Sequence, residues 1–262
     1  MPHLTHFIDD GVATLTLHNP PQNRIDEQMT SDLADALEEV GRSDARAVLL
    51  RSDGPDFSWG GDITTWPDAD ARELRTLFER HTSVFNEFER LPLPVIAAVH
   101  GLCFGGGLEL ALRADVIFAA ESARFGHPEQ TLGIVTLLGG IYRVAERAGR
   151  SRAFEWALTS EQVPAAVMAS AGVVNRVVAD EALFHEAGVF AQRVAKGPTR
   201  AYAAHKALLR AWAVGGVAAA DETMLDIAMP LFETHDVEAG LASAVNAIRA
   251  GRPRPVLEFQ GR

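Results

Sequence analysis

The sequence predicts an α/β fold, with strands and helices alternating through the first half of the chain and a helical C-terminal segment after them. Two patterns support this prediction. Short apolar runs alternate with segments of helical periodicity up to about residue 180, and helical patterns dominate beyond it. The 262 residues, 47% hydrophobic and 23% charged, are enough to bury a large core, and this composition excludes a disordered chain.

The first half contains the predicted strands and their intervening helices. The expected elements are a hairpin of residues 3–8 and 12–17, a helix over 26–41, a strand over 45–51, a helix over 74–88, strands over 94–99 and 116–119, and a short helix after Gly105-Gly106-Gly107. Asp9-Asp10-Gly11 is the turn of the hairpin. Apolar residues at helical spacing support the first helix, and Gly41 is expected to end it.

The second half contains helix after helix. Gly197-Pro198, Gly215-Gly216 and Pro230 punctuate it, and few strand signals follow 173–178. We therefore expect a core domain over 1–195 and a helical cap or oligomerisation segment over 196–262.

Charge narrows the possible partners. The formal net charge of −11 argues against nucleic-acid binding. Only two lysines occur, so an anionic ligand must be held mostly by arginine or by backbone amides at helix N-termini. The uncharged run from Leu91 to Leu108 contains two prolines and four glycines, and it is interpreted as a buried strand with a glycine turn, not a membrane span. No membrane partner is expected.

Cys103 is the single cysteine, which excludes an intramolecular disulfide and a cysteine-rich zinc site. We interpret it as a core residue. No secretory signal is visible, so a cytoplasmic location is expected. His3, His6 and His235-Asp236 lack partners at ligand spacing, and no metal site is predicted. The usual dinucleotide, P-loop, nucleophile-elbow and zinc-protease motifs do not occur in the sequence.

Two glycine-rich segments remain as candidates for chemistry. They are Phe57–Ile63 and His100–Glu109, each near the end of a predicted strand. A helix that starts at Gly105-Gly106-Gly107 would point free amides at a ligand, although a tight packing turn explains the glycines equally well. Glu109 would lie in its first turn, and Glu129 follows a later strand. Two carboxylates near amide donors suit acid–base chemistry beside an oxyanion, but spacing alone does not bring these residues together.

The order of several motifs resembles the crotonase, or enoyl-CoA hydratase/isomerase, superfamily. The motifs are Leu17-His18-Asn19-Pro20 with Asn23, Phe57-Ser58-Trp59-Gly60-Gly61-Asp62, Ala98-Val99-His100-Gly101, Gly105-Gly106-Gly107-Leu108-Glu109, Phe125-Gly126-His127-Pro128-Glu129, Gly139-Gly140 and Gly172-Val173-Val174-Asn175. The resemblance implies a spiral of ββα units and C-terminal helices that build a homotrimer or a dimer of trimers. It also implies an acyl-CoA substrate whose coenzyme A is part of the thioester, and no prosthetic group.

The resemblance also implies roles for particular residues. The amides of Gly61 and Gly106 match the pair that holds the thioester oxygen, and Glu109 and Glu129 match the two glutamates of related hydratases. CoA contacts are expected at Asp62, Ile63 and Thr64. Arg24 is a candidate phosphate partner or an ordinary surface arginine. Leu137 and Leu138 replace small residues and should reshape the acyl pocket.

Other departures from the family pattern put the substrate in doubt. They are Trp59 in place of a small residue, His127 before Pro128, and Ala244 in place of an aromatic residue. The expected activity is hydration of a 2-enoyl-CoA. An isomerase, a thioester or C–C hydrolase, and a non-catalytic acyl-CoA-binding protein are the alternatives, and the presence of both glutamates favours hydration.

Overall fold

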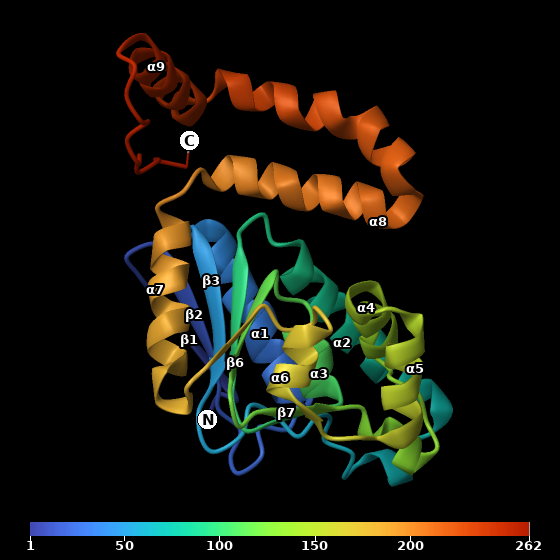
Figure 1. Cartoon of the computed structure of the whole chain (residues 1–262). Coiled ribbons are helices and arrows are strands. Elements are labelled where there is room, and N and C mark those ends of the chain that lie inside the picture. The colour runs from blue at the N-terminus through green and yellow to red at the C-terminus, as the bar shows by residue number, and fades with distance from the viewer. Residues whose placement is uncertain (262) are drawn as a thin grey trace.

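The computed structural model describes residues 1–261 as two sheets surrounded by helices (Figure 1). The larger sheet has the strand order β1-β2-β3-β4-β6-β9 and the smaller one β5-β7-β8. The strands are β1 (Leu4–Asp9), β2 (Val12–Leu17), β3 (Ala47–Ser52), β4 (Val95–Val99), β5 (Leu102–Phe104), β6 (Val116–Ala120), β7 (Arg124–Gly126), β8 (Val163–Pro164) and β9 (Arg176–Val178). The β1–β2 hairpin is antiparallel, whereas the other neighbours in the larger sheet are parallel.

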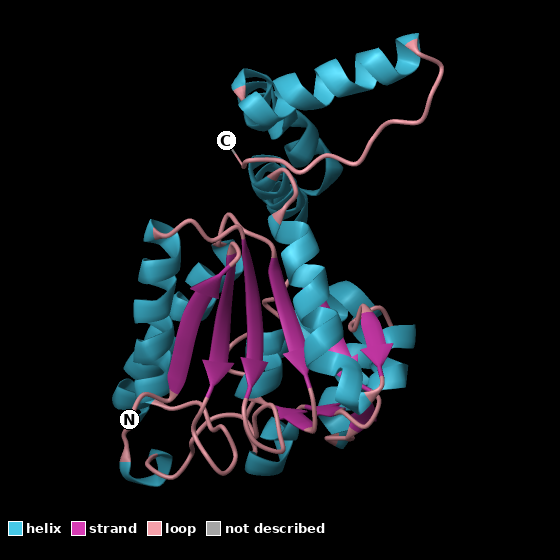
Figure 2. Ribbon diagram, turned by 90° about the vertical axis from the view of Figure 1, so that its left-hand side faces the viewer, coloured by secondary structure: helices cyan, strands magenta, loops and turns pink. Residues whose placement is uncertain are grey.

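Helices cover the larger sheet and extend beyond it (Figure 2). They are α1 (Glu27–Arg42), α2 (Ala71–Arg90), α3 (Gly106–Ala111), α4 (Gly140–Ala148), α5 (Arg150–Thr159), α6 (Ala165–Ser170), α7 (Leu183–Ala195), α8 (Thr199–Ala228) and α9 (His235–Arg249), with short 3₁₀ turns η1 (Trp66–Asp68), η2 (Pro128–Leu132), η3 (Asp180–Ala182) and η4 (Met229–Glu233). Every residue of β2 and β4 is buried, so both faces of the sheet are covered. Helices α1 and α7 both pack against this sheet.

Local sequence explains where α1 begins. The Asp26 side chain accepts a hydrogen bond from the Met29 amide at 2.8 Å, and the apolar stripe of α1 faces the core. The expected end at Gly41 is wrong by one residue, because the helix continues through Arg42 and the Ser43 amide bonds the Val40 carbonyl. The hairpin and the helices of the first half are confirmed, with shifts of a few residues at their ends.

The C-terminal segment forms an arm that lies beyond one end of the sheet (Figure 1). Helix α8 is interrupted at Gly216, whose φ of 72° is one that glycine adopts without strain. The chain returns to the core near its end, where Arg46 donates to the Phe259 carbonyl at 2.7 Å. No helix within residues 1–261 is both long and apolar enough to cross a bilayer.

Candidate active site

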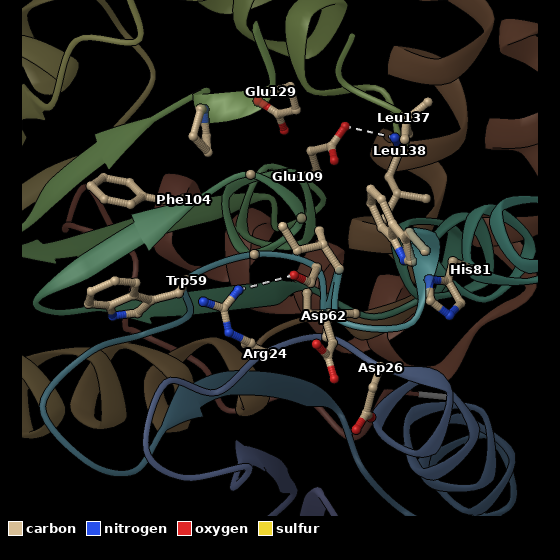
Figure 3. A pocket seen from close by; sticks show the side chains of 18 of the residues that line it. Arg24, Asp26, Trp59, Asp62, His81, Phe104, Glu109, Glu129, Leu137 and Leu138 are labelled. Atoms are coloured by element: carbon tan, nitrogen blue, oxygen red, sulfur yellow. Dashed lines mark hydrogen bonds between the residues drawn. The ribbon is translucent and has the colours of Figure 1, made fainter. Parts of the chain in front are cut away.

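A cavity of about 630 Å³ opens where loops from distant parts of the chain meet (Figure 3). Its walls include Arg24–Gln28, Trp59–Ile63, Trp66, Phe78, His81, Gly105, Gly106, Glu109, Pro128, Glu129, Leu137 and Leu138. The cavity therefore contains both glutamates and both glycines that the sequence singled out.

Close packing between two loops brings the glycines together. The buried Ser58 hydroxyl donates to the Asn23 carbonyl at 2.6 Å and accepts from the Gly60 amide at 3.1 Å. A methyl group on Gly107 would lie only 2.5 Å from Ser58 Cβ, so glycine is needed for α3 to approach this loop.

The amides of Gly61 and Gly106 have no partner within the described chain. A methyl group on Gly106 would lie 3.4 Å from the Gly61 nitrogen, which places the two residues side by side. Gly106 is the first residue of α3, where amides lack intrahelical acceptors. Neither N–H donates to an acceptor in residues 1–261. Two free amide donors thus lie next to each other at the cavity wall.

Glu109 lies in the first turn of α3 and is only 2% exposed. Its Oε1 accepts hydrogen bonds from the Leu138 amide at 2.8 Å and the Gly140 amide at 2.9 Å. Burial raises the pKa of Glu109, and these two hydrogen bonds oppose the rise. The hydrogen bonds orient the side chain and favour its carboxylate form.

An ionic network around the buried Arg113 fixes the loop that holds Glu109. The Arg113 guanidinium donates to the Leu138 carbonyl at 2.7 Å, and Arg143 donates to the Gly139 carbonyl at 3.2 Å. Both arginines also bind Glu89, Arg113 at 2.9 Å and Arg143 at 2.8 Å. The Arg113 side chain has no exposed surface, so Glu89 compensates a charge that water does not reach.

Glu129 lies in η2 and is 9% exposed. Burial, followed by the negative charge of Glu109, raises the pKa of Glu129 to about 7. Its Oε2 has no hydrogen-bond partner among residues 1–261. The cavity thus contains Glu109, whose two amide hydrogen bonds favour its carboxylate form, and Glu129, whose raised pKa lets it still hold a proton near neutral pH. This arrangement offers a base and an acid beside two amide donors.

The structure places most of the other expected residues at the same cavity. Asp62, Ile63 and Leu137 line it. Arg24 also lines it and donates to the Gly61 carbonyl at 3.3 Å. Thr64 lies outside the lining, and its hydroxyl donates to Asp62 at 2.8 Å.

The residues of the cavity wall that sequence reasoning missed include an aromatic pair and a histidine. Trp66 and Phe78 form an edge-to-face pair with ring centroids 5.1 Å apart, and His81 is 5% exposed. Phe78 and His81 fall within the helix expected over 74–88, but its spacing gave no sign that this part of α2 borders a cavity. Cys103 is buried in β5, which confirms its interpretation as a core residue. The described part of the chain contains no cluster of three potential metal ligands.

The chain is similar to several known proteins. The family model described as enoyl-CoA hydratase/isomerase matches residues 8–245. A Bacillus subtilis protein named "Probable enoyl-CoA hydratase" is 34% identical over 67% of this chain and 69% of its own. The Escherichia coli 1,2-epoxyphenylacetyl-CoA isomerase is 35% identical over 76% of this chain and 78% of its own. The crystal structure of a Mycobacterium smegmatis enoyl-CoA hydratase superposes with a TM-score of 0.87 at 30% identity, covering 97% and 99% of the two chains.

Proposed function

The chain belongs to the enoyl-CoA hydratase/isomerase family, and we propose that within this family it adds water across the 2,3 double bond of a 2-enoyl-CoA. The observation that carries this proposal is the pairing of Glu109, whose carboxylate accepts two amide hydrogen bonds, with the buried Glu129 in one cavity. Hydration needs both a base and an acid, and this pair supplies one of each.

The two free amides suit the oxygen of the thioester. As water attacks Cβ, negative charge moves onto the thioester oxygen and forms an enolate. The Gly61 and Gly106 N–H groups donate to this oxygen. Since backbone amides are fixed before the charge develops, they stabilise the transition state without reorganising, and loss of one such donor typically costs about 3 kcal/mol.

The glutamates move the protons. Glu109 orients the attacking water and takes one of its protons while the water oxygen bonds to Cβ. Glu129 then delivers its proton to Cα and is left as a carboxylate. One water is consumed: its hydroxyl ends on Cβ and its other proton on Glu109, while the proton on Cα comes from Glu129. Return of a proton from Glu109 to Glu129 by way of solvent restores both groups for the next cycle.

The remaining cavity residues are assigned to the two parts of the substrate, its CoA and its acyl chain. Arg24, Asp62 and Ile63 are proposed to contact CoA, and Leu137 is proposed to contact the acyl chain. Thr64 is retained only as a partner of Asp62.

We also propose that residues 196–262 mediate a trimer. The exposed apolar residues Trp212, Val214 and Val217 on α8 support this proposal.

Double-bond isomerisation is the second candidate. Its support is the family description, which covers hydratases and isomerases, and the similarity to a protein named 1,2-epoxyphenylacetyl-CoA isomerase. Isomerisation moves one proton and needs only one of the two glutamates.

Enoyl-thioester absorbance separates these candidates. Hydration of short, long, branched or aromatic 2-enoyl-CoAs is expected to remove the absorbance, and Glu109→Gln is expected to abolish this loss because an amide does not accept the proton. Appearance of absorbance from a 3-enoyl-CoA would indicate an isomerase instead. Release of free thiol would indicate a hydrolase, and no change with any acyl-CoA would contradict an enzymatic role.

The pH dependence of hydration is expected to be narrow. Glu109 must be deprotonated and Glu129 protonated, and the pKa of both is raised by burial. We expect kcat/KM to fall above pH of about 7 as Glu129 loses its proton, and to fall on the acid side at a pH above the ordinary range of a glutamate as Glu109 gains one. Initial rates from pH 5 to 9 test this; a rate that stays constant up to pH 9 would contradict the assigned proton on Glu129.

A further inference from the structure

A buried histidine next to Glu129 takes no part in the proton transfers. His127 is 2% exposed, and neither ring nitrogen has a hydrogen-bond partner within residues 1–261. Glu129 Oε2 is also unpartnered, and it lies 3.8 Å from His127 Nδ1. Buried polar atoms are rarely left unpaired, and here the unpaired atoms of two side chains face each other.

One contact fixes the backbone of His127 and another confines its ring. The His127 carbonyl accepts a hydrogen bond from the Ser160 hydroxyl at 3.0 Å, and Pro128 follows in the chain. A methyl group on Gly140 would lie 2.7 Å from His127 Cε1 and 2.9 Å from Glu109 Cγ, so the ring is wedged against the start of α4. Because the ring is confined, the Glu129 side chain is the one that can move to close the 3.8 Å separation between Nδ1 and Oε2.

The ring is a neutral donor. Burial lowers the pKa of His127 to about 4, so it carries no charge at neutral pH. A neutral imidazole has one N–H, and a buried N–H without an acceptor is costlier than an unused lone pair. The proton thus belongs on Nδ1, which faces Glu129. Glu109 on α3 is a titratable group that packs beside this ring at Gly140, and Arg113 and Arg143, whose charges act on Glu109, are both bound to Glu89.

We propose that His127 is a positioning residue for Glu129, and that its Nδ1–H donates to Oε2 of the carboxylate left when Glu129 gives its proton to the substrate. The assignment of Glu129 as the acid rests on the proposed function; the hydrogen bond itself does not. A donor on a carboxylate forms a stronger bond than one on a neutral carboxyl group, so His127 favours the state of Glu129 that follows proton transfer. The histidine keeps its own proton throughout.

The hydrogen bond is tested on the free protein, without turnover. The infrared band of a buried carboxyl group, assigned to Glu129 by its loss in Glu129→Gln, is followed against pH in the wild type and in His127→Phe and His127→Gln. Phenylalanine removes the donor, and the midpoint is expected to rise by about one unit, a tenfold change in the protonation equilibrium. Glutamine retains a donor and is expected to titrate close to the wild type. His185→Phe on the exposed side of α7 controls for the change of side chain.

Steady-state kinetics provide a second test of the role of His127. His127→Phe is expected to lower kcat about 10-fold or more with KM changed less than about twofold, and His127→Gln to restore most of it. An unchanged infrared midpoint in His127→Phe overturns the proposal. If that variant does not fold, His127→Leu, which is smaller, is measured by the same criterion. Failure of the wild type to hydrate any enoyl-CoA would overturn the proposed function alone, because the infrared titration still decides whether the bond exists.

Discussion

Replacing Glu129 with glutamine is expected to lower kcat for hydration by about 10³-fold while KM changes little, since general acid–base groups contribute about 10²–10⁴ to the rate. Glutamine keeps the shape of the side chain but has no proton to give to Cα. The variant's amide does not affect the two backbone donors at Gly61 and Gly106, so substrate binding is retained. The loss of enoyl-thioester absorbance at pH 6, where wild-type Glu129 is protonated, provides the measurement.

The stability of the same variant separates a chemical loss from a structural one. Because the pKa of Glu129 is raised from 4.5 to about 7, the native state is favoured below pH of about 4.5 and loses that advantage as pH rises through about 7. A shift of this size corresponds to about 3 kcal/mol. Glu129→Gln does not titrate, so it is expected to gain stability relative to the wild type over this range in urea unfolding. A variant that turns over near the wild-type rate would rule out Glu129 as the acid.

Local sequence patterns were sufficient to predict the main strands and helices of the core. The apolar spacing of α1 and its Asp26 cap, and the Asp9-Asp10-Gly11 turn between β1 and β2, are properties of neighbouring residues and could be predicted from the sequence. The end of α1 at Arg42 could not be predicted in this way. The free-energy cost of Gly41 inside a helix is small enough for packing to override it.

The site depended on long-range contacts that no local pattern contains. Resemblance to a family indicated Gly61, Gly106, Glu109 and Glu129, but not what holds them. The ionic network joins Glu89 to Arg143, which lies 54 positions further along the chain. The residues next to Arg113 in the sequence give no sign that its side chain is part of this network. The motif around His127 marked the residue as unusual, and only the structure shows its unpaired nitrogens beside Glu129.

Gly107→Ala sets two effects of opposite sign against each other, and we expect the unfavourable one to win. Alanine favours a helix over glycine by about 1 kcal/mol. Against this, its methyl group would lie 2.5 Å from Ser58 Cβ and 3.0 Å from the Ser58 carbonyl oxygen, and Ser58 is fully buried with its hydroxyl bound to Asn23. Overpacking of this kind typically costs about 1–3 kcal/mol, and here its relief requires α3 to move away from the loop that carries Gly61.

The expected result of Gly107→Ala is therefore a net loss of stability together with a fall in kcat of about 10²-fold, because a displacement of about 1 Å between the Gly61 and Gly106 amides weakens their joint grip on one oxygen. Gly188→Ala in α7 is the matched control: a methyl group there meets nothing within 4 Å, so the free energy of unfolding should rise by about 0.5–1 kcal/mol with activity unchanged. Urea unfolding and initial rates on both variants provide the comparison. Equal stabilisation of the two, with full activity, would mean that α3 does not press on the Ser58 loop, and the alignment of the two amides would then need another cause.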